Sequence, residues 1–88
     1  MENKLSKYRQ QINQIDMELL ELLKKRFAVT EKVGYYKKQH NINVFDEKRE
    51  QEILKKLLEQ LQDTPYKKHI ETMWKTLLVE SKKQQKNL

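Results

Sequence analysis

The longest regular pattern in this sequence is a stretch of helical periodicity from Leu5 to Gln39. It contains no proline and a single glycine, Gly34. Its apolar residues recur in alternating steps of three and four, which places them on one face of an α-helix. We call this face the apolar stripe; its members are Leu5, Tyr8, Ile12, Ile15, Leu19, Leu22, Val29 and Val33, and position 26 completes the series between Leu22 and Val29.

The length of this helix sets a second constraint. At about 1.5 Å per residue it would extend roughly 50 Å, whereas a compact chain of this size is only about 30 Å across. The helix therefore either projects as a rod or is covered by a second copy of the chain. The apolar stripe favours the second copy, because a long apolar face is rarely left in water.

Composition predicts an all-α protein with short connections. The 88 residues include one glycine, one proline and no cysteine, so turn residues are too few for a sheet topology. We expect a single domain over residues 1–88, near the size at which a lone core is marginal. Without cysteine there is no disulfide framework, and the isolated His40 and His69 do not form a metal centre. We expect no metal and no cofactor.

Charge and hydropathy bear on partners and location. The net charge of +6 is compatible with a polyanion, but acidic residues are interspersed and no nucleic-acid-binding motif is present. Lys82, Lys83 and Lys86 are interpreted as a solvated, fraying helix end. The polar first residues and the lack of a long apolar run predict neither a signal peptide nor a membrane span. We expect a cytoplasmic protein that binds neither nucleic acid nor membrane.

Two shorter helices follow the long one. Phe45 precedes Asp46, a typical N-capping residue, and the second helix is predicted to run to about Gln62. Thr64 is predicted to cap the third helix, with Pro65 at its first position. The buried face of the second helix is predicted as Ile53, Leu54, Leu57, Leu58 and Leu61, and that of the third as Tyr66, Ile70, Met73, Trp74, Leu77 and Leu78.

Two cations interrupt the apolar face of the first helix. Arg26 occupies the position where the three-four series calls for a leucine, and Lys37, eleven residues on, lies within about 20° of it around the helix. Arg26 alone could extend its guanidinium to solvent or pair with a carboxylate across the bundle. Lys37 alone could complement the dipole at the helix end.

The other two helices also direct polar groups into their apolar faces. Glu50 lies inside the face of the second helix with Arg49 on its flank, and Ser81 and Gln85 continue the face of the third. Glu50 alone could be a structural partner of Arg26, and Ser81 and Gln85 could mark the end of the core. Together, however, these groups leave an excess of cations in an apolar interior.

Buried cations of this kind require an anion. Burial of an unbalanced ion costs several kcal/mol, arginine suits bidentate recognition of carboxylates, and Ser, Gln and Glu form hydrogen bonds to hydroxyl or ether oxygens. The pattern predicts a pocket for a small dicarboxylate with hydroxyl and ether oxygens. Arg9 lies 17 residues from Arg26, roughly 25 Å along the axis, so it is expected to reach such a pocket only in the other copy of an antiparallel dimer.

The chain resembles the all-helical chorismate mutases over nearly its full length, from about Leu5 to Gln85. The motifs that carry this resemblance are Tyr8-Arg9-Gln10-Gln11-Ile12 with Ile15-Asp16, Leu22-Leu23-Lys24-Lys25-Arg26, Val33-Gly34-Tyr35-Tyr36-Lys37, Asp46-Glu47-Lys48-Arg49-Glu50, and Glu80-Ser81 with Gln85. The resemblance implies an intertwined homodimer of three-helix protomers. It also implies rearrangement of chorismate to prephenate, a step towards phenylalanine and tyrosine that needs no cofactor.

The resemblance also implies roles for individual residues. Arg26 and the Arg9 of the second copy would bind the two substrate carboxylates, with Ser81 supporting a carboxylate. Lys37 would contact a carboxylate and the ether oxygen.

Further roles concern the oxygens of the substrate. Gln85 would donate a hydrogen bond to that same ether oxygen. Glu50 and the Asp46 region would hold the ring hydroxyl, with Arg49 as a neighbouring support.

Two alternatives stay open at this point. An isochorismate pyruvate-lyase would have the same fold and a similar cationic pocket. A helical interaction module, docking as a regulatory partner on another enzyme of the shikimate pathway, would need no catalytic site, although such docking could coexist with activity. Identification of the product distinguishes a lyase from a mutase. Arg26→Ala distinguishes an interaction module from an enzyme, because a module that only binds should keep its function in this variant.

Overall fold

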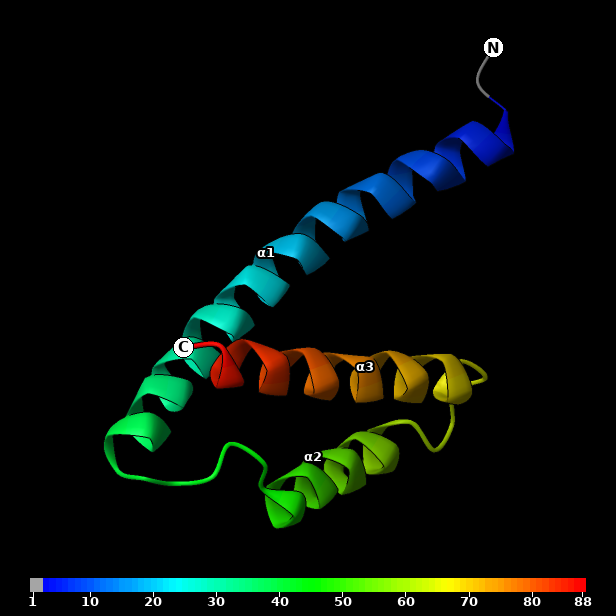
Figure 1. Ribbon diagram of the computed structural model, residues 1–88. Helices are drawn as coiled ribbons and strands as arrows, with labels where there is room; N and C mark the ends of the chain where they lie inside the picture. Colours follow the sequence, from blue (N-terminus) through cyan, green and yellow to red (C-terminus); the bar gives the residue numbers. More distant parts are fainter. Residues whose placement is uncertain (1–2) are drawn as a thin grey trace.

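The computed structural model describes residues 3–88, and in this range the chain forms three helices joined by short connections. Helix α1 spans Lys4–Gln39, α2 spans Glu47–Gln60 and α3 spans Lys67–Lys86. Helix α3 contacts both α1 and α2. Figure 1 shows α3 crossing the C-terminal half of α1 while α2 runs below α3. The prediction of one long and two shorter helices is confirmed.

Helix α1 begins and ends close to where its sequence pattern predicts. The Asn3 side chain accepts a hydrogen bond from the Ser6 backbone N–H at 2.8 Å, which caps the first turn. At the other end Asn41 adopts a φ of 56°, a left-handed conformation that asparagine tolerates better than most residues. The Ile42 N–H then donates to the Lys37 carbonyl at 2.8 Å. The chain thereby turns back towards α2.

The start of α2 is confirmed and its end comes slightly early. The Asp46 carboxylate accepts a hydrogen bond from the Arg49 N–H at 3.0 Å, as expected for an N-cap. Glu47 and Glu50 lie in the first turn, where a carboxylate is favourable to the helix dipole. The helix ends at Gln60, two residues before the predicted boundary, because the Leu61 N–H bonds to the Leu58 carbonyl in a tighter turn.

The predicted start of the third helix is wrong. Thr64 was expected as its N-cap, but the Thr64 hydroxyl accepts a hydrogen bond from the Tyr66 N–H at 3.3 Å inside a turn that contains Pro65. The first helical bond instead links the Ile70 N–H to the Tyr66 carbonyl at 3.0 Å. A short side-chain bond at the threonine thus replaces the first helical turn, and α3 begins at Lys67.

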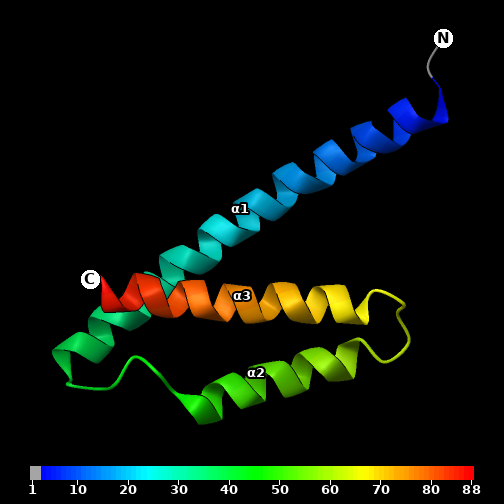
Figure 2. The same cartoon turned by 45° about the vertical axis from the view of Figure 1, so that its right-hand side comes forward.

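Packing within one chain is sparse. Among the described residues only Leu61 and Leu78 are buried apolar side chains, and the predicted inward residues Tyr66 and Met73 are mostly exposed. All eight members of the apolar stripe of α1 are exposed, Leu22 by 62%. The N-terminal half of α1 projects away from the other helices (Figure 2). Within residues 3–88, neither α2 nor α3 therefore covers the N-terminal half of the stripe.

The dimensions of the molecule also show that a single chain is extended. The molecule measures 60 × 27 × 14 Å with a radius of gyration of 16.8 Å, whereas a compact chain of this length has about 12 Å. Within residues 3–88 no helix is both long enough and apolar enough to cross a bilayer.

Candidate functional site

A cavity of about 300 Å³ lies between the C-terminal half of α1, the start of α2 and the C-terminal half of α3. Valines of α1 and the loop, with Ile53 and Leu78, form its apolar wall. Seven of the eight predicted site residues line it: Arg26, Lys37, Asp46, Arg49, Glu50, Ser81 and Gln85. The structure thus brings together polar groups from three helices that are far apart in sequence.

Arg26 is held by α3. Its Nη1 donates to the Ser81 hydroxyl at 2.7 Å, and that hydroxyl donates to the Leu77 carbonyl at 2.8 Å. Ser81 is buried, with 6% exposure. Burial, and secondly the charge of Arg49, lower the pKa of Arg26 from its ordinary value, although a guanidinium remains protonated throughout the working pH range. Partial desolvation strengthens the attraction of this group for an anion.

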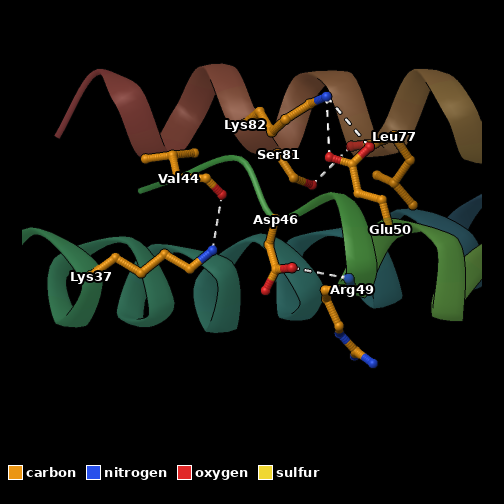
Figure 3. A network of polar contacts seen from close by, with 8 residues as sticks. All are labelled: Lys37, Val44, Asp46, Arg49, Glu50, Leu77, Ser81 and Lys82. Atoms are coloured by element: carbon orange, nitrogen blue, oxygen red, sulfur yellow. Dashed lines mark hydrogen bonds and ion pairs between the residues drawn. The ribbon is translucent and has the colours of Figure 1, made fainter. Parts of the chain in front are cut away.

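Lys37 is tied to the loop between α1 and α2. Its Nζ donates to the carbonyl of Val44, a residue of this loop, at 2.9 Å (Figure 3). The ammonium has two further donors. Lys37 is therefore positioned at the cavity wall while it retains the capacity to bind an anion.

Glu50 carries the acidic charge at the opposite side of the cavity. Its carboxylate forms an ion pair with Lys82 of α3, 3.1 Å from Nζ to Oε2. Figure 3 shows the Lys82 side chain reaching Glu50 from above. The ammonium also lies 4.8 Å from the centre of the Phe45 ring, within cation–π range.

Asp46 and Arg49 line the cavity, but their side chains interact mainly with groups of α2 itself. The Asp46 carboxylate is occupied by the helix cap, and the Arg49 side chain extends away from Glu50 (Figure 3). Its Nη1 lies 3.9 Å from Glu52 Oε2 in a largely exposed pair. Asp46 therefore fixes the start of α2, which orients Glu50 one turn later.

Gln85 approaches α1 at its single glycine. A Cβ on Gly34 would lie 2.9 Å from Gln85 Cγ and 2.5 Å from Leu88 Cδ1. Beside it, Thr30 Oγ1 donates to Gln84 Oε1 at 2.6 Å and Gln84 Nε2 donates to the Phe27 carbonyl at 2.9 Å. These contacts fix the rotation of α3 so that Gln85 lines the cavity.

The electrostatic balance of the cavity is positive. Four cations, Arg26, Lys37, Arg49 and Lys82, face two carboxylates, an excess of two positive charges. Within the described chain neither Arg26 nor Lys37 forms an ion pair. The arrangement can therefore accept a small molecule with two negative charges.

Arg9 lies outside the cavity of its own chain. It is exposed on the projecting half of α1 and does not line the cavity. The expectation that Arg9 serves the cavity of another copy stays a prediction. Across residues 3–88 no cluster of three or more His, Asp or Glu side chains is suited to bind a metal.

Lys82 is the charged lining residue that sequence reasoning missed. It was grouped with Lys83 and Lys86 as a solvated helix end, but it lines the cavity with only 28% of its side chain exposed. A signal was present, since Lys82 follows the buried Leu78 by four residues and so continues the same face. The uncharged Thr30 was also missed.

Comparison with protein families finds a match over most of the chain. The family model described as chorismate mutase type II matches residues 8–86. Neither the comparison with curated proteins nor that with solved structures found a match. The matched range includes all three helices except the first turn of α1, and it contains every residue of the cavity.

Proposed function

The chain belongs to the type II chorismate mutase family, and on this basis we propose that it catalyses the rearrangement of chorismate to prephenate. The observation that supports this most strongly is the cavity with an excess of two positive charges. Chorismate carries two carboxylates, a ring hydroxyl and an ether oxygen, and the cavity offers partners for each.

The reaction is intramolecular. One C–O bond breaks as one C–C bond forms, and no atom is gained or lost. The protein therefore needs no nucleophile; it contributes by holding the compact conformer in which the reacting carbons are close. Arg26 binds one carboxylate through its guanidinium, and Ser81, its hydrogen-bond partner at 2.7 Å, orients that group.

Negative charge grows on the ether oxygen as the C–O bond breaks. Lys37 supplies an ammonium and Gln85 an amide N–H, both at the cavity wall. Donors that are already in place stabilise such developing charge without reorganisation. Glu50, at the other side, accepts a hydrogen bond from the ring hydroxyl.

The active form proposed is an intertwined homodimer. It is supported by the exposed apolar stripe of α1, which a second copy would cover. In an antiparallel pair centred near residue 19, the middle of the stripe, Arg26 would lie opposite Ile12. Arg9 is three residues from Ile12, about 4.5 Å along the axis. An arginine side chain spans that distance, so the partner's Arg9 reaches the second carboxylate.

Incubation of the purified chain with chorismate tests the proposal. Loss of chorismate absorbance with prephenate as the product is the expected result. Release of pyruvate from isochorismate, without turnover of chorismate, would instead identify a lyase.

Site variants link turnover to this cavity. Lys37→Ala should abolish most activity, whereas Lys75→Ala should not, because Lys75 is exposed and, within residues 3–88, pairs only with Glu71. Full activity of Lys37→Ala would contradict the proposed site.

A further inference from the structure

Lys82 is a cation of the cavity to which neither the family resemblance nor the proposed reaction gives a role. It comes from α3, one residue after Ser81, and lines the same cavity as Arg26 and Lys37. Its neighbours Lys83 and Lys86 are exposed, so the three lysines are not equivalent. A lysine kept inside a cavity that already has an excess of positive charge requires a specific reason.

The contacts of Lys82 are directed at one group. Its Nζ lies 3.1 Å from Glu50 Oε2 and 3.4 Å from Glu50 Oε1, so it spans both carboxylate oxygens. The Phe45 ring covers the ammonium at 4.8 Å. The two side chains of the pair are 28% and 23% exposed, whereas those of the Arg49–Glu52 pair are 60% and 51% exposed. Partial burial reduces solvent screening and strengthens the Lys82–Glu50 attraction.

The other cations of the cavity have different partners. Arg26 donates to Ser81, Lys37 donates to the Val44 carbonyl, and Arg49 pairs with Glu52. Lys82 is therefore the cation that holds the Glu50 carboxylate. Without it, the remaining cations lining the cavity with Glu50 would be Arg26, Lys37 and Arg49. A Glu50 carboxylate that moved towards Arg26 or Lys37 would compete with the carboxylates of the substrate.

We propose that Lys82 is a positioning residue that holds the Glu50 carboxylate at the hydroxyl-binding side of the cavity and apart from the substrate-binding cations. This inference rests on the proposed function, because it assigns Glu50 to the ring hydroxyl. Lys82 acts through Glu50 and does not touch the reacting atoms. Its ammonium fixes both carboxylate oxygens, so that the free lone pairs face the bound substrate.

The test compares Lys82→Met and Lys82→Arg with wild type. Methionine keeps an unbranched side chain of similar length but removes the charge, whereas arginine keeps the charge and the ability to pair with a carboxylate. Lys82→Met should lower kcat/KM for chorismate about tenfold, mostly through a higher KM, because a mobile Glu50 competes for the cations. Lys82→Arg should restore most of the loss. Lys83→Met is the matched control, since Lys83 is exposed and its ion-pair partner among the described residues is Glu80, which does not line the cavity.

A double-mutant cycle with Glu50→Gln separates positioning from a general structural effect. If Lys82 acts through Glu50, then Lys82→Met should cost about tenfold in wild type and almost nothing in Glu50→Gln. Circular dichroism and thermal melting establish that each variant is folded, and Lys82→Gln serves as a second uncharged variant if Lys82→Met does not fold.

Two results would overturn the inference while leaving the proposed function intact. One is that the wild type is active and Lys82→Met has the same kcat/KM as the wild type. The other is an equal loss in the wild-type and Glu50→Gln backgrounds, which would mean that Lys82 acts independently of Glu50. A folded wild type with no turnover of chorismate would instead refute the proposed function, and with it the role of Lys82.

Discussion

Gly34→Ala should lower the turnover rate while it changes the stability of the fold only slightly. The added Cβ would lie 2.9 Å from Gln85 Cγ and 3.2 Å from Gln85 Cβ, against ordinary contact distances of 3.4 Å or more. Gln85 Cγ must therefore move by about 0.5 Å, and the amide at the end of the side chain moves further. A misplacement of about 1 Å at a reacting group costs roughly 100-fold in rate. We expect kcat to fall at least about tenfold.

Stability should change little in the same variant. Alanine in a helix interior is favoured over glycine by about 0.8–1 kcal/mol, while an extra methyl group in a close contact costs about 1–3 kcal/mol. These effects largely offset each other, so the net destabilisation should stay below about 2 kcal/mol. Steady-state turnover of chorismate and thermal unfolding measure the two effects on one preparation.

A matched variant identifies the contact responsible. The same Cβ would lie 2.5 Å from Leu88 Cδ1, the end of a flexible side chain. Leu88→Ala removes that contact and leaves Gln85 in place. If Gly34→Ala combined with Leu88→Ala recovers full turnover, or if Gly34→Ala alone keeps wild-type kcat, the reasoning about Gln85 is refuted.

Three further predictions concern the charged groups of the site. Arg26→Ala should lower kcat/KM by about 100-fold or more, while circular dichroism shows that the helices stay folded. A dicarboxylate transition-state analogue should raise the melting temperature of Arg26→Ala less than that of the wild type. An equal rise would contradict the assignment. Wild-type kcat should be nearly flat from about pH 6 to 8, because the Gln85 amide does not titrate and Arg26, despite its lowered pKa, stays protonated. Gln85→Glu should instead gain activity towards acid pH, because a glutamate must be protonated to donate, and a flat profile for this variant would count against Gln85 as the donor. An equal mixture of Arg9→Ala and Lys37→Ala chains should recover about one quarter of wild-type activity, since half of the dimers are mixed and each has one intact site; no recovery after subunit exchange would exclude a role for Arg9 across an interface.

The sequence predicted α1 well because one signal runs through the whole element. Its three-four spacing is apolar at every position except Arg26, and no proline or second glycine lies within it, so few alternatives compete. The same periodicity placed Arg26 and Lys37 on one face, and the cavity has both. Asp46 was identified as a cap by its residue type, and its carboxylate does accept the Arg49 N–H.

The sequence did not predict the features for which local chemistry allows two arrangements. Thr64 can cap a helix or close a turn, and the bond to the Tyr66 N–H decides for the turn. Lys82 was grouped with its charged neighbours, although helical spacing from Leu78 places it on the inner face. Which cation binds Glu50 depends on the packing of α3 against α2, and no local pattern encodes that distance. The homodimer remains a prediction.

Because the apolar stripe of α1 is uncovered in a single chain, the activity and the stability of this protein should depend on its concentration. One chain buries only Leu61 and Leu78 among its described apolar residues, so most of the free energy that a second copy would contribute is absent from a lone chain. Under the proposed assembly, specific activity should decline when the enzyme is diluted below the dissociation constant of the pair, and concentration should restore it. The melting temperature should likewise rise with protein concentration. The amount of enzyme present would then set the fraction of complete sites as well as their number.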